Sequence, residues 1–209
     1  MKLAMKLTGS SRGGPAKVAV ISSMLFGSIS GSAVANVVGT GVFTIPLMKR
    51  TGYKSHFAGA VEAVASTGGQ IMPPVMGSGA FIMSELLGMR YSSIALGALI
   101  PAILYYFSVF MMVDLEAART GLKGVDTSKM EKTSTLLKSG WNLLLPLIVL
   151  IYLLVIQRAT VSRSAVWAII AAIISCSIKS SSRLSLKQIL DTIELGVNRS
   201  LSVIAAVAC

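Results

Sequence analysis

Two long apolar stretches, each interrupted in its middle, constrain the fold of this chain more than any other feature. The first runs over 17–48 and the second over 55–87, which are 32 and 33 residues. As a continuous helix each would be about 50 Å long, whereas the hydrocarbon core of a membrane is about 30 Å thick. The interruptions are Gly-Ser-Ile-Ser-Gly-Ser at 27–32 and Ser-Thr-Gly-Gly-Gln-Ile-Met-Pro-Pro at 66–74. Because glycine and proline punctuate helices, we expect each stretch to be broken or folded back.

The composition excludes an ordinary soluble globule. Of the 209 residues, 54% are hydrophobic and 13% are charged, and the mean hydropathy is +0.76; soluble domains carry about 25% charge. The 19 basic residues lie between apolar runs rather than on one polar face, which favours loops beside a lipid bilayer over nucleic-acid binding. The sequence contains no phosphate loop, and Cys176, Cys209 and His56 form no disulfide or metal pattern. We therefore expect no ATP hydrolysis in this chain, no cofactor and no transition metal.

Three further apolar segments complete an all-α integral membrane protein. Residues 91–113 have the length of a spanning helix, and 141–157 begins with Trp141, an aromatic suited to the headgroup boundary. The run 165–178 is short and crosses only if it extends toward Val161. A charged connector at 114–140 and an interfacial amphipathic helix at 185–200 are predicted between and after these segments.

The distribution of basic residues predicts the topology. If 17–48 is a re-entrant hairpin and the other four segments cross, 16 of the 19 basic residues lie on one side and 3 on the other. If the first stretch crosses, the split is 12 to 7, and if both long stretches are re-entrant it is 10 to 9. Because positive charge accumulates on cytoplasmic loops, the one-hairpin arrangement is favoured. It places the N-terminal segment in the cytoplasm.

Two helix breaks at membrane depth predict one shared polar site. Non-helical backbone is tolerated there only where protein or a water-filled cavity satisfies it, and carbonyls freed at a break can replace the water around a small cation. The breaks also offer side-chain oxygens, and hard oxygen donors suit Na⁺. The oxygen-bearing residues are Ser30, Ser32, Asn36, Ser66, Thr67 and Gln70, and the glycines that allow unwinding are Gly68 and Gly69.

Each candidate also has a structural interpretation. Gly27 and Gly31 form a GxxxG pair, which commonly serves close helix packing. Glu62 is an intramembrane carboxyl and hence a candidate for ion coupling, or it caps a neighbouring polar group. For His56 and Glu85, near segment ends, solvation at the interface is favoured. The methionines are expected to serve helix packing.

Three motifs resemble one transporter family. Gly-Ser-Ile-Ser-Gly-Ser-Ala-Val-Ala-Asn at 27–36, Ile-Pro-Leu-Met-Lys-Arg-Thr-Gly-Tyr at 45–53 and Ala-Ser-Thr-Gly-Gly-Gln-Ile-Met-Pro-Pro at 65–74 occur in order. Together they are similar to the large permease subunit of tripartite ATP-independent periplasmic (TRAP) transporters, over nearly the whole chain. Gly69-Gln70, where other branches usually have Gly-Pro, resembles the branch that fuses the small and large membrane subunits.

The resemblance implies a secondary transporter of the ion transporter superfamily in the bacterial inner membrane, built from two inverted repeats that work as an elevator. It implies Na⁺-coupled import of carboxylate-type organic anions, a periplasmic substrate-binding protein, and a small membrane subunit or its fused equivalent. The first break would be a hairpin tip and the second the unwound centre of the adjoining helix. Both would form a Na⁺ site from Ser30, Ser32, Asn36, Ser66, Thr67, Gly68 and Gly69, and a substrate wall from Ser28, Gly31, Gln70, Pro73 and Pro74.

The same resemblance implies a division of the chain. Residues 1–113 would belong to the transport domain, 114–140 to a cytoplasmic connector, 141–178 to scaffold helices, and 185–209 to an arm with the truncated start of a second repeat. The second hairpin would then lie beyond this sequence, so we expect a fragment of a longer product. Two alternatives stay open: a secondary transporter of this architecture that uses no binding protein, and a structural membrane subunit.

Overall fold

The computed structural model describes residues 2–122, 124–125, 145–157, 160–178, 188, 191–192 and 194–197. All regular elements in these residues are helical. The chain divides into two compact units, Met1–Ser139 and Gly140–Cys209, which are described separately.

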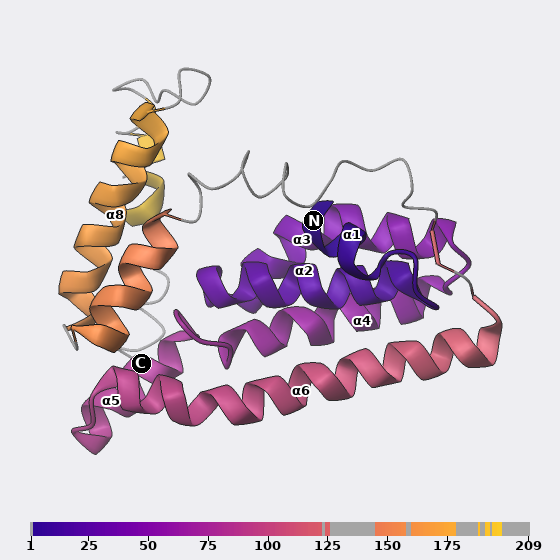
Figure 1. Ribbon diagram of the computed structural model, residues 1–209, viewed down its shortest axis with the longest axis horizontal. Helices are drawn as coiled ribbons and strands as arrows, with labels where there is room; N and C mark the ends of the chain where they lie inside the picture. Colours follow the sequence, from indigo (N-terminus) through magenta and orange to yellow (C-terminus); the bar gives the residue numbers. More distant parts are fainter. Residues whose placement is uncertain are drawn as a thin grey trace. The chain divides into compact units, whose positions relative to one another are not determined.

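The first unit is a bundle of helices. Helices α2, α3 and α4 each contact the other two, and α6 lies along α2 and α4 (Figure 1). The short helix α1 packs on α2, and α5 packs on α6. The elements are α1 (Lys2–Thr8), α2 (Gly14–Ser30), α3 (Ala33–Arg50), α4 (Ser55–Thr67), the 3₁₀ turn η1 (Gly68–Gln70), α5 (Ser78–Leu87) and α6 (Tyr91–Thr120).

The first apolar stretch is a helical hairpin, so the prediction of a break is confirmed. Helix α2 ends at Ser30, and Gly31 follows in the left-handed conformation with φ 62°. The Gly31 amide donates to the carbonyl of Gly27 at 2.8 Å, which closes the last turn of α2. Ser32 then caps α3, because its Oγ accepts a hydrogen bond from the amide of Ala35 at 3.3 Å.

The second apolar stretch is also broken, as predicted. Helix α4 ends at Thr67, tightens into η1, and is followed by irregular chain up to Gly77, directly before α5. The irregular part contains a cis peptide bond between Pro73 and Pro74. The break thus falls on the Gly-Gly and Pro-Pro pairs of the sequence.

Helix α6 has 30 residues, and the predicted end at Val113 is wrong. The helix continues to Thr120 and ends at Gly121, whose φ of 68° provides a left-handed C-cap. Its charged residues are compatible with the helix because they are paired: Asp114 contacts Lys17 and Arg12, and Glu116 binds Arg119 one turn later. Within the described residues, α6 is the one helix long and apolar enough to cross a membrane, with a mean hydropathy of 2.0 in its most apolar window.

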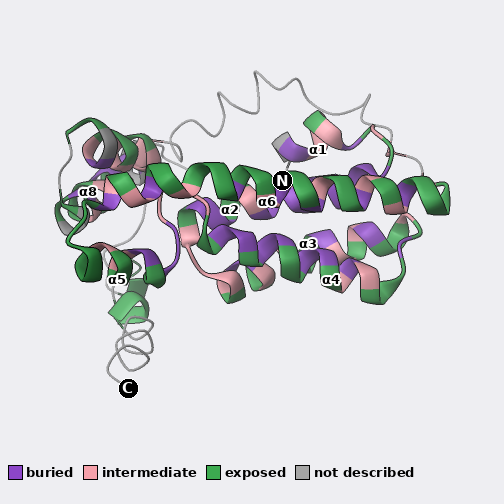
Figure 2. Ribbon diagram, turned by 90° about the horizontal axis from the view of Figure 1, so that it is seen from below, coloured by how far each residue is buried: buried purple, intermediate pink, exposed green. Residues whose placement is uncertain are grey.

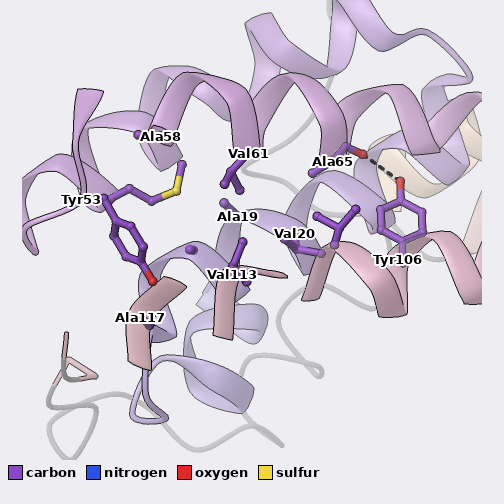
Figure 3. Packing of buried hydrophobic residues seen from close by; sticks show 12 residues of the cluster. Ala19, Val20, Tyr53, Ala58, Val61, Ala65, Tyr106, Val113 and Ala117 are labelled. Atoms are coloured by element: carbon purple, nitrogen blue, oxygen red, sulfur yellow. Dashed lines mark hydrogen bonds between the residues drawn. The ribbon is translucent and has the colours of Figure 1, made fainter. Parts of the chain in front are cut away.

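The core of the first unit lies between α2, α4 and α6 (Figure 3). Small side chains allow the helices to approach, and larger ones fill the remaining space. Buried members include Ala19, Val61, Ala65, Tyr106 and Val113. The outward faces of α3 and α6 are exposed (Figure 2), and many of the side chains on them are large and apolar. On α3 these residues include Val34, Val38 and Val42, and on α6 they include Leu104, Phe107 and Met112. Broad apolar exposure on paired helices fits a lipid or protein environment rather than water.

One end of the bundle is fastened by polar contacts. Lys17 is 8% exposed, and its ammonium lies 2.6 Å from Asp114 and 5.0 Å from the ring centre of Phe110. Tyr53, in the loop between α3 and α4, donates to the carbonyl of Gly13 at 3.4 Å. Burial, with smaller effects from Asp114 and Glu116, raises the pKa of Tyr53 to about 12, so the phenol remains a donor at neutral pH. The ion pair ties the start of α2 to the last turns of α6, and the phenol ties the loop between α3 and α4 to the residue before α2.

The second unit contains two described helical segments. Residues 145–151 are α-helical and continue into a π-helical turn, Tyr152–Ile156. Helix α8 spans Val161–Ile178, so the 165–178 run does extend to Val161, which was the condition for it to cross a membrane. Trp141, Cys209 and most of the 114–140 and 185–200 predictions lie outside the described residues.

Candidate functional site

The two helix breaks lie against each other, which confirms that they are neighbours. The amide of Val75 in the second break donates to the carbonyl of Ser28 in the first at 3.1 Å. A Cβ on Gly31 would lie 1.9 Å from the carbonyl oxygen of Met76, so only glycine fits this contact. The hairpin tip and the unwound chain after α4 therefore form one structure.

Glycines make this approach possible. A Cβ on Gly27 would lie 2.6 Å from the Cα of Gly69, and a Cβ on Gly69 would lie 2.6 Å from the Cα of Gly27. Gly27 therefore serves close packing, which agrees with the structural interpretation of the GxxxG pair. Gly31, the other glycine of the pair, supplies the left-handed turn. Gly68 packs on the rings of Tyr105 and Tyr106, and a Cβ on Gly68 would lie 2.6 Å from the nearest Tyr105 carbon.

The side chain of Asn36, in α3, binds both α2 and the end of α4. Its side chain is 0% exposed, and its Nδ2 donates to the carbonyl of Ser23 at 2.8 Å and to that of Ser66 at 3.5 Å. Ser23 belongs to α2 and Ser66 to the last turn of α4. One amide thus joins all three helices of the inner bundle.

A buried hydroxyl cage surrounds the carboxyl of Glu62, which is 0% exposed. Its Oε1 accepts from Ser23 Oγ at 3.1 Å, from Ser66 Oγ at 3.2 Å and from Thr40 Oγ1. Its Oε2 accepts from Thr44 Oγ1. A buried carboxyl requires such donors, because an unsatisfied one is costly.

Sequence reasoning missed Ser23, Thr40 and Thr44, the donors from α2 and α3. A signal was present: Asn36, Thr40 and Thr44 recur every four residues in an otherwise apolar helix, which places them on one face. That spacing predicts a polar stripe toward a neighbouring helix. The carboxyl of Glu62 is the group that this stripe meets.

Three predicted cation ligands keep their hydroxyls near their own backbone. Ser32 Oγ caps α3, and Ser30 Oγ lies 3.4 Å from the amide of Ser32. Thr67 Oγ1 donates to the carbonyl of Ala63 at 2.8 Å, one turn back, and its residue is exposed. Thr67 therefore does not join the buried cluster of Asn36 and Ser66.

The predicted substrate residues are distributed around the contact between the breaks. Ser28 is buried and its Oγ donates to the carbonyl of Leu25 at 2.9 Å. The Gln70 side chain is exposed, while its carbonyl accepts from the amide of Gly77 at 2.7 Å. The Pro74 carbonyl accepts from the phenol of Tyr91 at 3.0 Å, and Pro73 is partly exposed. Gly31 is the turn residue already described.

Two tyrosines of α6 satisfy carbonyls at the end of α4. Tyr106 donates to the carbonyl of Ala65 at 3.0 Å, as drawn in Figure 3, and Tyr105 donates to that of Val64 at 2.8 Å. His56 and Glu85 are exposed. Among the described residues, no group of three or more His, Cys, Asp or Glu side chains is placed to hold a metal ion.

Comparisons with known proteins identify the family. The family described as "Tripartite ATP-independent periplasmic transporter, DctM component" matches residues 1–209. A putative TRAP transporter large permease protein from Haemophilus influenzae is 30% identical over 149 residues, which are 71% of this chain and 35% of that protein. An isethionate TRAP transporter permease protein DctMQ from Oleidesulfovibrio alaskensis is 29% identical over 72% of this chain and 24% of its own length.

A C4-dicarboxylate TRAP transporter large permease protein DctM from Vibrio cholerae is 28% identical over 72% of this chain and 33% of its own length. The chain thus spans about a third or less of the length of these relatives. The DctM family consists of transporter permeases rather than enzymes, and its members are membrane proteins. This chain belongs to the DctM family, the large permease component of TRAP transporters.

Proposed function

We propose that this chain is part of a permease that imports carboxylate-type organic anions with a Na⁺ gradient. The family membership supports a secondary transporter. Two relatives are named for isethionate and C4-dicarboxylates, which are organic anions. A periplasmic binding protein delivers the substrate, and a small membrane subunit, separate or fused, completes the permease. The nearly equal identities of 30% and 29% to a large permease and to a DctMQ protein favour neither arrangement, so the fused branch remains a prediction.

The pairing of the two helix breaks carries this proposal. It brings the end of α2, the start of α3 and the end of α4 to one place, with Val75 bonded to Ser28. Broken helices in transporters hold ions with freed carbonyls and anions with half-helix N-termini. Here α3 begins at Ala33 and α5 at Ser78, each directly after a break. The substrate wall is proposed along Ser28, Gly31, Gln70, Pro73 and Pro74.

The hydroxyls at the breaks are compatible with cation binding despite their local hydrogen bonds. Thr67 Oγ1 uses its proton toward Ala63, and Ser66 Oγ uses its proton toward Glu62. A hydroxyl that donates its proton retains lone pairs, and a cation is bound by lone pairs. We propose Na⁺ ligands among Ser30, Ser32, Asn36, Ser66 and Thr67, together with the backbone at Gly68 and Gly69.

The full-length permease that contains this chain provides the test. We would measure its thermal stability in NaCl and in choline chloride at equal ionic strength, for Ser32→Ala, Thr67→Ala and the double variant. A shared ion predicts weaker Na⁺-specific stabilisation in each single variant and a non-additive loss in the double variant. Ser108→Ala is the control for Thr67→Ala, because Ser108 also donates to a carbonyl one turn back, at 2.8 Å from Leu104, on an exposed face of α6.

Equal Na⁺ stabilisation of all variants, or strictly additive small losses, would contradict the shared site. Absence of any Na⁺-specific stabilisation of the wild type would contradict Na⁺ coupling itself. In that case uptake driven by a proton gradient becomes the next measurement.

A further inference from the structure

The side-chain amide of Asn36 has a fixed orientation. Carbonyl oxygens only accept hydrogen bonds, so the end of the amide that faces the carbonyls of Ser23 and Ser66 must be the NH₂ group. Oδ1 is then turned to the other side, where Thr40 Oγ1 lies 3.2 Å away. If Thr40 donates its proton there, one of the two lone pairs of Oδ1 is used.

Thr40 has one proton and four acceptors within reach. They are the Asn36 carbonyl at 2.8 Å, Asn36 Oδ1 at 3.2 Å, Ser23 Oγ at 3.1 Å, and Oε1 of Glu62. A hydroxyl donates to one of them at a time, and a carboxylate is a stronger acceptor than a neutral amide, carbonyl or hydroxyl oxygen. The Glu62 carboxylate therefore attracts the Thr40 proton away from Asn36.

We propose that Glu62 is a positioning residue that keeps Asn36 Oδ1 free to bind the coupling cation by taking the Thr40 proton. This inference rests on the proposed Na⁺ coupling and assigns Glu62 a place behind the site rather than in it. The hydroxyls of Ser23, Thr44 and Ser66 contact the carboxylate directly, which leaves no room for an ion between them and Glu62.

The variant Glu62→Gln reverses this arrangement with little change of shape. The glutamine amide can donate its own proton to Thr40 Oγ1, and the Thr40 hydroxyl then turns to its remaining acceptors, which are Ser23 Oγ and the two oxygens of Asn36, including Oδ1. That hydrogen bond uses one of the two lone pairs of Oδ1 and draws electron density away from the other, which weakens Oδ1 as a cation ligand. We expect the Na⁺ concentration for half-maximal thermal stabilisation to rise about tenfold, which corresponds to about 1.4 kcal/mol.

Removal of the Thr40 hydroxyl provides the decisive comparison. Thr40→Val keeps the shape of the side chain but has no proton to place on Asn36 Oδ1. The double variant Thr40→Val with Glu62→Gln should therefore recover the Na⁺ dependence of the wild type, although Glu62→Gln alone does not. A purely structural role of Glu62 predicts the opposite, because the double variant would lose more contacts than either single one.

Two variants serve as controls. Thr44→Val removes a buried hydroxyl that donates to the other carboxylate oxygen rather than to Asn36, so it should lower stability without changing Na⁺ affinity. Glu85→Gln removes an exposed carboxyl in α5 and should change neither. The probe is Na⁺ alone, titrated against the purified full-length permease with choline as the replacement ion.

Each outcome decides the inference. A tenfold loss in Glu62→Gln that Thr40→Val restores supports it. Unchanged Na⁺ dependence in Glu62→Gln, or a double variant as weak as Glu62→Gln, overturns it while the proposed function stands. A wild type without Na⁺-specific stabilisation overturns both. If Glu62→Gln alone does not fold, the double variant is compared with Thr40→Val, and a tenfold difference between them overturns the inference.

Discussion

Gly27 and Gly69 face each other across the two helix breaks, and a Cβ on either would lie 2.6 Å from the Cα of the other. The contact joins α2 to the 3₁₀ turn after α4 without an intervening side chain. Asn36 Nδ2 lies 2.9 Å from the same Cβ position on Gly27, so there is no free space in that direction either.

Gly69→Ala should therefore destabilise the permease by about 2 kcal/mol or more, because overpacking against backbone cannot be relieved by a rotamer change. Gly59→Ala is the matched control: Gly59 lies within α4, and a Cβ there meets nothing within 4 Å. Alanine in a helix interior is favoured over glycine by about 0.5–1 kcal/mol, so this variant should be neutral or stabilising. Thermal unfolding in detergent measures both, and equal values for the two variants would refute the tight contact.

Gly31→Ala should be more damaging than Gly88→Ala. Both glycines have left-handed backbone, with φ of 62° and 61°, so alanine costs about 1–2 kcal/mol at either position. Only Gly31 also faces an obstacle, because its Cβ would lie 1.9 Å from the Met76 carbonyl oxygen, whereas a Cβ on Gly88 meets nothing within 4 Å. The difference between the two melting temperatures isolates the contact of the hairpin tip with the second break. A smaller loss at Gly31 would contradict it.

Tyr106→Phe should lower stability by about 1 kcal/mol, because it leaves the carbonyl of Ala65 without the phenol that bonds it at 3.0 Å in the buried core. Tyr105→Phe removes the corresponding bond to Val64 in a more exposed position and should cost less. Chemical denaturation of the two variants, side by side, gives the order. The reverse order would mean that α6 is not held to α4 through Tyr106.

Asp114→Asn should lower the melting temperature more than Arg12→Ala. Asp114 pairs with both cations, and its loss leaves the ammonium of Lys17, 8% exposed, without a counter-ion, whereas Arg12 is 54% exposed and can turn to solvent. Lys17→Met with Asp114→Asn should recover part of the loss, because no buried charge then remains. A double variant worse than Asp114→Asn alone would contradict this explanation.

The orientation predicted from the basic residues can be tested by cysteine labelling in cells. Cysteines at Lys49 and Lys129 should be protected from an impermeant thiol reagent added outside, and one at Arg158 should react. Labelling at Lys49 without labelling at Lys129 would mean that the first stretch crosses the membrane. A cysteine at His56, next to the same loop as Lys49, should behave as Lys49 does.

The positions of the helix breaks were predictable from the sequence because they depend on local chemistry. Gly31 is needed for a left-handed turn, and the Gly-Gly and Pro-Pro pairs interrupt α4 whatever surrounds them. The prediction ended α6 seven residues too early, because it placed the end of the helix before the charged residues Asp114 and Glu116 instead of at a glycine C-cap. Gly121 offered the stop signal. The charge of Asp114 is neutralised by partners more than 90 residues away in α2 and the loop before it, while Glu116 pairs with Arg119 within the helix.

Only the tertiary structure decided which polar side chains meet. Ser23, Thr40 and Glu62 come from three helices, and their sequence separations of 39 and 22 residues carry no local signal of contact. Ser66 and Thr67 are adjacent in sequence, yet one points into the cage and the other is exposed, because successive residues of a helix face different directions. The sequence therefore determined where the chain breaks and what chemistry the breaks offer, while helix packing determined which of those groups share a site.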